Sequence, residues 1–490
     1  MNQENNVEEI KDNSFDSKKE KTTIIQTDVG AKDGLNKCPK CGSTDISPVG
    51  NGGKLKCHFC RHEFEPEKAE GLSGDISKLD GKVISSGAQD IVSGETDIVT
   101  LKCSGCGAEV VIDTNEALQA RCHWCRNTLS INQQVPNGSV PDVVLPFYIS
   151  KEDAKAEIQK FVSKRNFFAH PKFVKEFTTE NICGVFFPYM IVDVNAHCRF
   201  TGQGEHQTRS YRVKSGDNYV TRYDADLYDV QREFDIEIDD LAVESSADKL
   251  DKNSEDKTNN VINAIMPFDL MNVVKWDANY LKGYTSEKRD LNIDQIKPHV
   301  SAQAKDVARF AANDSLQFYD RGVRWDSQDI NVKGEKWSSA YLPVWLYSYQ
   351  QKKGNKSVLH YVAVNGRTKE VMGSIPINMF RLLFVSILVG LIFFGIWCKV
   401  DFEGDVLFLT PGFITYFVIY YRYRNKDARH RHEVETRRKV LNLQQADKYV
   451  IDKKGLSNHI MTGANNNVVD AAGKQNFITK VIEQNNLNKK

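Results

Sequence analysis

The chain of 490 residues has no excess of charge of either sign. It carries 65 basic and 65 acidic residues, and its formal net charge at pH 7 is zero. Proteins that bind nucleic acid through bulk attraction need a basic surplus, because much of the affinity comes from lysine and arginine contacts to phosphate. The composition therefore gives no support to general nucleic-acid binding by the chain as a whole.

The sequence also lacks the short motifs that mark common catalytic sites. It contains no Gly-x-Ser-x-Gly turn, no Walker phosphate loop, no His-Glu-x-x-His motif and no dinucleotide-binding glycine fingerprint. His197 and Cys198 are adjacent, and adjacent residues of a strand point to opposite faces, so they do not predict a nucleophile pair. Asp193 and His206 are polar candidates without a supporting motif. We therefore predict no catalytic residue, no cofactor-binding residue and no enzymatic activity of these classes.

Residues 1–36 contain no signal segment, which would combine a charged start with an apolar run. They are rich in Asn, Asp, Glu, Lys and Ser, and we expect a disordered tail because little apolar surface is present to offset the entropy of ordering. Without a signal segment, the expected compartment is reducing. Cysteines are then expected as thiols or metal-bound thiolates.

Eight of the eleven cysteines form two copies of one spacing. In each copy, fifteen residues separate two Cys-x-x-Cys pairs, and equivalent cysteines of the two copies lie 65 positions apart. The metal ligands predicted from this pattern are Cys38, Cys41, Cys57, Cys60, Cys103, Cys106, Cys122 and Cys125. Thiolate sulfur suits zinc, and four protein ligands leave no open position for a catalytic water. We predict two structural zinc ions, one in a ribbon over 37–64 and one in a ribbon over 99–131.

Two other uses of these cysteines fit the pattern less well. Disulfides or scattered core thiols do not explain four pairs at matched spacing, and they conflict with a reducing compartment. A rubredoxin-like iron site would use the same four thiolates. Of the remaining cysteines, Cys183 and Cys198 are expected to be buried, unreactive thiols.

The residues inside the second pair of each copy are also repeated. His58 and His123 each follow a predicted ligand directly. Because four thiolates already complete the zinc tetrahedron, we expect both histidines at the surface. The next residues, Phe59 and Trp124, are either contact anchors for a partner or pack on their own hairpins, and the sequence leaves both interpretations open.

The fold class expected for the chain is multidomain, with the two small β zinc ribbons joined to a larger domain. Residues 65–98 are rich in Gly, Ser and Asp and predict a flexible linker. Residues 143–376 predict one soluble, strand-rich α+β domain. Its expected elements are a helix capped by Ser150, a helix near 299–313, strands over 185–200 and 227–238, a hairpin turn at 215–218 and a meander over 340–373.

Two uncharged apolar stretches follow this domain, at 382–398 and 406–421. Spanning helices usually need about 20 apolar residues, so we predict a C-terminal transmembrane helical hairpin over 377–421 that contacts membrane lipid. A buried helical hairpin in a soluble core is the alternative. The segment over 422–490 begins with a basic juxtamembrane stretch, within which 433–453 can continue as a charged helix. Positive charge stays inside, so we expect a multi-pass plasma-membrane protein with both termini and the main domain cytoplasmic.

The cysteine quartets resemble zinc ribbons of the transcription factor IIB type. Besides these cysteines and the final apolar hairpin, the sequence contains three motifs, which are Gly184-Val-Phe-Phe-Pro188-Tyr189, Tyr341-Leu-Pro343-Val-Trp345 and Tyr361-Val-Ala-Val-Asn-Gly366. On these features, the chain over 38–425 resembles uncharacterised bacterial membrane proteins that carry such ribbons. Some of these are labelled helicase-like from their cysteines alone. The resemblance implies zinc binding and membrane attachment, but it supplies no activity. Helicase motor residues are absent from this sequence.

Three functional hypotheses follow from these observations. The first is a membrane-anchored zinc protein that acts as a protein-interaction or scaffold module for a cytosolic protein partner. The second is a membrane-tethered nucleic-acid-binding protein related to transcription, which would use the ribbon lysines and arginines. The third is an enzyme of unknown type within 143–376, which would require a cluster of polar side chains in that domain.

Overall fold

The structure is a computed structural model that describes the chain in ranges separated by gaps. The described residues are 22–25, 38–43, 46–49, 54–65, 69, 75–91, 98–102, 106–113, 119–125, 128–130, 134–135, 141–215, 218–246, 263–276, 278–281, 283–287, 289–353, 356–400, 410–423 and 431–457. The predicted ligand Cys103 lies outside these ranges. So do most of the predicted tail over 1–36 and the end of the chain after 457.

Strands outnumber helices in the described ranges. The strands are β1 (Thr22–Ile25), β2 (Ile46–Val49), β3 (Lys54–Cys57), β4 (Glu63–Phe64), β5 (Gly81–Ser85), β6 (Ile98–Lys102), β7 (Glu109–Asp113), β8 (Gln119–Arg121), β9 (Thr128–Ser130), β10 (Gln134–Val135), β11 (Val143–Val144), β12 (Cys183–Ser215), β13 (Asn218–Glu244), β14 (Val274–Lys275), β15 (Thr285–Glu287), β16 (Val323–Lys353), β17 (Lys356–Asn365), β18 (Val371–Gly373) and β19 (Arg437–Ser457). The α-helices are α1 (Lys151–Ser163), α2 (Pro171–Glu176), α3 (Ile293–Asn313), α4 (Met379–Val400), α5 (Thr410–Tyr423) and α6 (His432–Glu435). Short 3₁₀ turns are η1 (Ile76–Lys78), η2 (Ser86–Ala88), η3 (Thr179–Asn181), η4 (Asn263–Ile265), η5 (Leu270–Asn272) and η6 (Ala278–Leu281).

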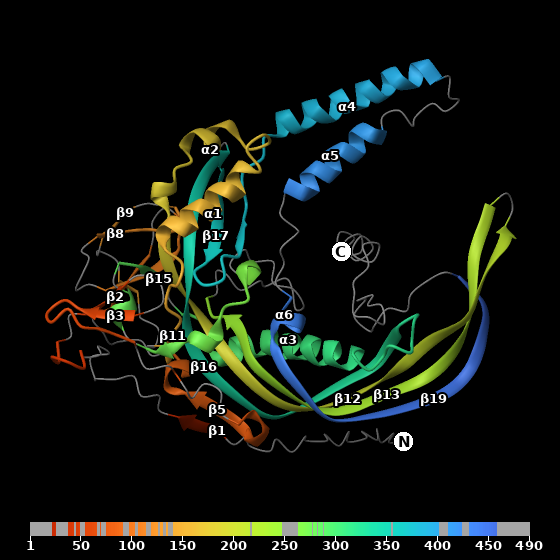
Figure 1. Cartoon of the computed structure of the whole chain (residues 1–490), viewed down its shortest axis with the longest axis horizontal. Helices are drawn as coiled ribbons and strands as arrows, with labels where there is room; N and C mark the ends of the chain where they lie inside the picture. Colours follow the sequence, from red (N-terminus) through yellow and green to blue (C-terminus); the bar gives the residue numbers. More distant parts are fainter. Residues whose placement is uncertain are drawn as a thin grey trace, which may run out of the picture.

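Four long antiparallel strands form the body of the main sheet, in the order β16-β12-β13-β19. They bend strongly along their length (Figure 1). The pairing of β12 shifts register between Val192 and Val194 and between Gln207 and Arg209, and β-bulges of this kind bend a strand. The predicted hairpin turn is confirmed, since β12 ends at Ser215 and β13 begins at Asn218. The predicted meander is confirmed as β16, β17 and β18.

Helix α3 lies inside the curve of the sheet (Figure 1). Asn292 and Gln295 form a capping box at its start, in which each side chain accepts from the backbone of the other residue. The buried face of α3 includes Val300 and Val307, which join a core cluster with Trp337 of β16. The helix predicted near 299–313 therefore exists, and its start is six residues earlier because the capping box precedes the apolar repeat.

The helix predicted after Ser150 is also confirmed. Ser150 caps α1 by accepting the N–H of Asp153 at 3.1 Å. Ala154 and Ile158 on its apolar face are fully buried, in a core cluster with Phe186 of β12 and Trp345 of β16. Trp345 lies eight residues after Trp337 on β16 and so points to the same face, which means that α1 and α3 cover different stretches of one face of the main sheet.

The flexible linker predicted over 65–98 is wrong for residues 75–91. Strand β5 pairs in parallel with β16, from Gly81 opposite Gly334 to Ile84 opposite Trp337. Strand β1, inside the predicted tail, pairs with β5. The buried carboxylate of Asp142 accepts the N–H of Gly87 at 2.7 Å and so holds the turn after β5. These polar segments are ordered by partners more than fifty residues away, which local composition does not reveal.

The charged helix predicted over 433–453 is also wrong. Only α6 is helical there, and β19 then runs antiparallel to β13 from Arg437 opposite Asp239 to Ser457 opposite Arg222. Its charged residues suit a solvent-exposed helix by propensity. The open edge of β13 instead pairs with β19 along most of its length, with three register shifts, and this tertiary contact overrides the local preference.

The second ribbon is not a separate unit in the structure. Strands β6 and β7 form a hairpin, and β7 pairs with β15 of the main sheet through Val111 opposite Ser286. The first ribbon keeps its own three-stranded sheet, β2-β3-β4. Its β2 lies against η6, and Ile46 and Leu55 join a core cluster with Val144. Ribbon 1 therefore has a sheet of its own, as the multidomain prediction expects, whereas ribbon 2 is part of the main sheet.

Helices α4 and α5 lie side by side and project away from the sheet (Figure 1). They approach closely at Gly412, where a Cβ atom would lie 2.8 Å from the carbonyl oxygen of Ser386. The side chains of α4 are described for 379–395. Among described residues, no helix combines the length and the apolar content that crossing a membrane requires. The spans over 382–398 and 406–421 stay a prediction.

Candidate metal centres

Ribbon 1 is organised by its small sheet, which places one cysteine pair at the end of a strand. Cys57 is the last residue of β3 and pairs with Ile46 of β2. Ile46 and Leu55 are buried beneath the sheet, with exposures of 0% and 1%. The alternation of β3 explains this, because Leu55 and Cys57 point to the same face while Lys54 and Lys56 point to the other.

Each cysteine pair of ribbon 1 lies on a tight turn. The N–H of Gly42 donates to the carbonyl oxygen of Cys38 at 2.8 Å, and that of Arg61 donates to Cys57 at 2.9 Å. Both donors follow the second cysteine and have positive φ, 73° for Gly42 and 57° for Arg61. This backbone turn brings the sulfur atoms of a Cys-x-x-Cys pair to one side. Glycine adopts it readily, whereas arginine does so with some strain.

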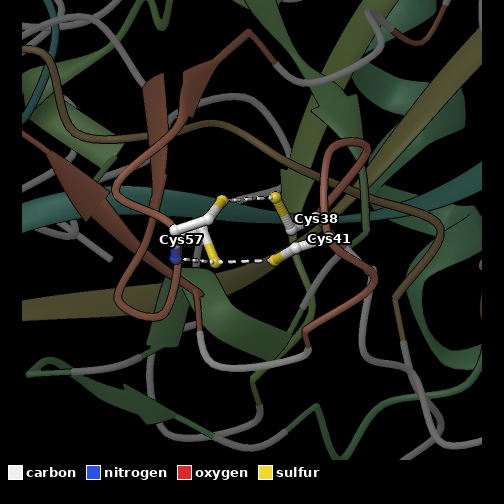
Figure 2. Close-up of side chains that lie close together, drawn as sticks. Cys38, Cys41 and Cys57 are labelled. Carbon is white, nitrogen blue, oxygen red and sulfur yellow. Dashed lines mark hydrogen bonds between the residues drawn. The ribbon is translucent and has the colours of Figure 1, made fainter.

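The four sulfur atoms of ribbon 1 converge on one point, all lying within 4.8 Å of one another. The Sγ atoms of Cys38 and Cys60 are 3.5 Å apart, and so are those of Cys41 and Cys57 (Figure 2). With Zn–S bonds of about 2.3 Å, a tetrahedral site requires sulfur separations of roughly 3.8 Å. The arrangement therefore fits a tetrahedral metal ion with only small adjustment.

The pKa values of these thiols reflect how closely the four sulfur atoms are packed. The pKa of Cys57 is lowered to about 6, chiefly by the backbone N–H of Cys60, which lies 3.5 Å from its sulfur. The pKa of Cys41 is raised to about 12: the backbone of Ser43 lowers it, but desolvation and the hydrogen bonds that its thiol donates to the other three sulfurs prevail. Thiolates this close repel one another, and a divalent cation removes that repulsion and stabilises all four.

Ribbon 2 contains the matching group. The sulfur atoms of Cys106, Cys122 and Cys125 lie within 4.8 Å of one another, and those of Cys106 and Cys122 are 3.6 Å apart. The fourth predicted ligand, Cys103, lies outside the described residues. The hydrogen bond between the thiol of Cys122 and the sulfur of Cys106, together with burial, raises the pKa of Cys122. Two cysteine clusters able to hold metal ions are thus present, and both have the chemistry that zinc prefers.

The two clusters differ sharply in what surrounds their second pair. Trp124 is only 2% exposed. Its ring makes edge contacts with Phe187 at 5.8 Å and Tyr361 at 5.2 Å between centroids, and its Nε1–H donates to Glu287 at 3.3 Å. Phe59, at the equivalent place in ribbon 1, is 80% exposed. Trp124 therefore packs on the main sheet rather than on its own hairpin. The ring of Phe59 is instead exposed to solvent, where a partner protein could contact it.

The two histidines follow the same difference. His58 is exposed, as predicted, and its Nε2 lies 2.7 Å from the hydroxyl of Ser47. The surface prediction for His123 is wrong, because it is 2% exposed and its ring meets Phe187 edge-on. Docking of ribbon 2 onto the sheet buries it. Glu287, the acceptor for Trp124, had no signal in the sequence since it lies more than 160 positions away.

A third group of possible metal ligands consists of Asp193, Asp239 and Asp240, whose carboxylates lie within 4.8 Å. Asp193 is buried, and desolvation raises its pKa to about 7. Arg437 of β19 donates to Asp239 at 3.0 Å and also to Asp240. Because this guanidinium already supplies positive charge, the group is explained as a structural ion cluster at the bulge of β12 and β13. The adjacent aspartates are the only sequence signal for it.

The remaining polar candidates have structural contacts. Cys198 is buried, and desolvation raises its pKa to about 12, so it is unreactive as expected. Cys183 is partly buried. His197 lies on the opposite face of β12, 2.9 Å from Asp235. His206 stacks on Phe318, with 4.1 Å between ring centroids. None of these groups forms a nucleophile pair in the described part of the chain.

Comparison with protein-family models, with curated proteins and with solved structures found no match for this chain. The resemblance to bacterial membrane proteins with zinc ribbons therefore stays a prediction.

Proposed function

We propose that the chain is a zinc-dependent protein-interaction scaffold, and that ribbon 1 provides its contact surface. One observation carries the proposal: Phe59 is 80% exposed on the turn between the cluster cysteines Cys57 and Cys60, whereas the equivalent Trp124 is 2% exposed. Large aromatic side chains at protein interfaces often supply much of the binding energy. A rigid turn that presents such a ring loses little entropy on binding.

Zinc is the metal that the proposal assigns to both clusters. Four thiolates in ribbon 1 and three described thiols in ribbon 2 match its preference for sulfur and tetrahedral geometry. In ribbon 1 the ion would join Cys38 and Cys41 to the end of β3 and hold the turn that carries Phe59. The ribbon-1 surface would then exist only in the metal-bound protein.

The proposal also places the protein at the cytoplasmic side of a membrane, anchored through α4 and α5. Support comes from apolar side chains that are 38% to 87% exposed along both helices. They are Met379, Phe380, Leu383, Phe384, Ile387, Leu388, Leu391, Ile392, Phe393, Phe394, Phe413, Ile414, Phe417, Val418 and Tyr421. Exposed apolar surface of this extent is typical of contact with lipid or with a partner protein.

Nucleic acid is the weaker alternative for ribbon 1. Lys56 binds Glu63 at 2.8 Å, and Lys54 lies 3.5 Å from Glu65. These acidic neighbours reduce the positive potential that phosphate binding requires. A gel-shift titration of the full chain with DNA and RNA should show no salt-dependent complex. A complex that weakens steeply with added salt would favour the alternative.

A crosslinking experiment tests the proposed contact surface. A photoreactive phenylalanine analogue is placed at Phe59 in the full chain, with Tyr219 as a matched control because it is 70% exposed on a distant hairpin. We expect one dominant protein adduct from position 59 in cells and none from position 219. Adding Cys57→Ser should abolish the adduct, because the turn loses its metal. Equal labelling from both positions, or an adduct that nuclease removes, contradicts the proposal.

A further inference from the structure

The turn between α1 and α2 is fastened to the first residues of α4. The backbone N–H of Asn378 donates to the carbonyl oxygen of Phe168 at 2.6 Å. The guanidinium of Arg381, in the first turn of α4, donates to the carbonyl oxygen of Phe167 at 3.0 Å. Figure 1 shows α2 and this turn beside the start of α4. The turn therefore keeps one position relative to the beginning of that helix.

The end of α5 reaches the same place. The hydroxyl of Tyr423, its last residue, donates to the carbonyl oxygen of Pro376 at 3.4 Å, and the backbone N–H of His170 donates to the same oxygen at 2.7 Å. Both apolar helices therefore leave the sheet domain at the α1–α2 turn. If α4 and α5 anchor the protein in a membrane, as proposed above, this turn lies at the level of the lipid headgroups.

The chain around this turn is basic. Residues 158–175 contain five Lys or Arg residues and no Asp or Glu, in a chain whose formal net charge is zero. Three of the five, Lys164, Lys172 and Lys175, are exposed. Glu157 precedes the stretch and is paired with Lys160 at 3.4 Å. A local surplus of cations of this kind attracts an anionic surface, although the whole chain is neutral.

Two aromatic side chains are exposed among these charges. Phe167 in the turn is 64% exposed, and Phe380 in the first turn of α4 is 87% exposed. Arg381, the next residue of α4, is exposed as well. Segments that lie in the headgroup region of a membrane combine apolar rings with Lys and Arg, because the rings enter the acyl boundary while the cations stay at the phosphates.

We propose that this surface binds the headgroups of anionic phospholipids. The surface, which we call the basic collar, consists of Lys164, Phe167, Lys172, Lys175, Phe380 and Arg381. Its two rings enter the boundary between headgroups and acyl chains, and its cations contact the phosphate groups around them. The inference rests on the membrane attachment proposed above, and it adds the class of lipid that the protein selects. Because the turn is fastened to α4, the contact also fixes the depth of the sheet domain.

Photocrosslinking to lipid tests the contact. The zinc-loaded full chain carries a diazirine analogue of phenylalanine at one position and is reconstituted in vesicles of equal parts phosphatidylglycerol and phosphatidylcholine. Position 167 reports the collar. Phe384, 68% exposed on α4, reports membrane insertion, and Phe318, 51% exposed in the turn after α3, is the control. We expect lipid adducts from 167 and 384 and none from 318.

The three positions separate this inference from the membrane attachment itself. Adducts from position 384 alone overturn the collar but leave the attachment standing. Adducts from neither 167 nor 384 contradict both proposals. A yield from position 318 equal to that from 167 also overturns the collar, because exposure by itself would then explain the labelling.

The lipid class of the adducts at position 167 tests the charges. One basic side chain near an anionic surface favours it by about fivefold, so phosphatidylglycerol adducts should exceed phosphatidylcholine adducts by at least about that factor. Reversing the three exposed lysines should bring the ratio close to one. This variant combines Lys164→Glu, Lys172→Glu and Lys175→Glu.

A matched control makes the same change of net charge at exposed positions of the distant β12–β13 hairpin. It combines Arg212→Glu, Lys214→Glu and Arg222→Glu. The lipid ratio at position 167 should keep its wild-type value in this control, and adducts from position 384 confirm that both variants insert. Equal labelling of the two lipids in wild type, or an equal loss of selectivity in both variants, overturns the proposal.

Discussion

The two ribbons share a ligand spacing and a repeated local sequence, yet their second cysteine pairs have opposite surroundings. In ribbon 1, His58 and Phe59 face solvent. In ribbon 2, His123 and Trp124 are both 2% exposed and pack against the main sheet. Ribbon 1 keeps its own small sheet, whereas ribbon 2 extends the main sheet through β7 and β15.

This difference separates two uses of one metal-binding unit. Under the proposed function, a metal ion in ribbon 2 would mainly support stability, because Trp124 beside the cluster packs against Phe187 of β12 and Tyr361 of β17. A metal ion in ribbon 1 would instead stiffen an exposed turn and mainly serve recognition. Duplication of a motif therefore does not imply duplication of a role, because the role depends on what the rest of the chain packs against it.

The largest expected effect comes from removing one metal ligand. Wild type should contain two zinc ions per chain, and Cys57→Ser and Cys122→Ser should each contain one. Structural zinc contributes about 10–16 kcal/mol, comparable to the whole stability of a domain. Cys122→Ser should therefore abolish cooperative unfolding of the main domain, while Cys57→Ser should mainly expose ribbon 1 to proteolysis. Zinc analysis, circular dichroism and limited proteolysis measure these outcomes.

Two results would contradict this prediction. Freshly purified wild type without zinc would exclude the assignment of the metal. Equal loss of cooperative unfolding in both variants would show that ribbon 1 supports the core as strongly as ribbon 2 does.

An intermediate effect is expected from the buried tryptophan. Trp124→Ala should lower the free energy of unfolding by about 3–5 kcal/mol, because it leaves a cavity beside Phe187 and Tyr361. Trp124→Phe fills most of that space but removes the N–H donor to Glu287, and should cost about 1–3 kcal/mol. Urea unfolding measures both values. Zinc content should stay at two per chain, and a loss of zinc would mean that the metal site had been damaged instead.

The smallest effect on stability is expected at Phe59. Phe59→Ala and Phe59→Trp should change the free energy of unfolding by no more than about 0.5 kcal/mol, as is usual for exposed positions. The same urea titration provides the comparison with Trp124. If Phe59→Ala destabilised the protein as much as Trp124→Ala, the two ribbons would be equivalent in the core and the proposed division of roles would fail.

Local patterns in the sequence predicted the elements that depend on neighbouring residues. The cap at Ser150, the hairpin turn at 215–218 and the strands of the meander over 340–373 are all present. The Cys-x-x-Cys turns are also local, since Gly42 and Arg61 close them with hydrogen bonds across four residues. Short-range backbone geometry is enough to place such features.

Elements ordered by distant partners were missed for a common reason. Strand β5 and the turn after it depend on β16 and on Asp142, and β19 depends on the edge of β13. Their own residues are polar or charged and favour a linker or a helix. Long-range pairing supplies the backbone hydrogen bonds and burial that decide their conformation, and one sequence does not show which segments will meet.

By itself, the sequence determined the ligand type and spacing of the two cysteine clusters, because coordination chemistry requires particular atoms on particular short turns. Only the tertiary structure decided that the second cysteine pair of ribbon 2 is buried against the main sheet, whereas the equivalent turn of ribbon 1 is exposed. The burial of His123 and Trp124 is created by Phe187, Glu287 and Tyr361, which come from three different strands. Burial of this kind is a property of the assembled fold and not of the motif.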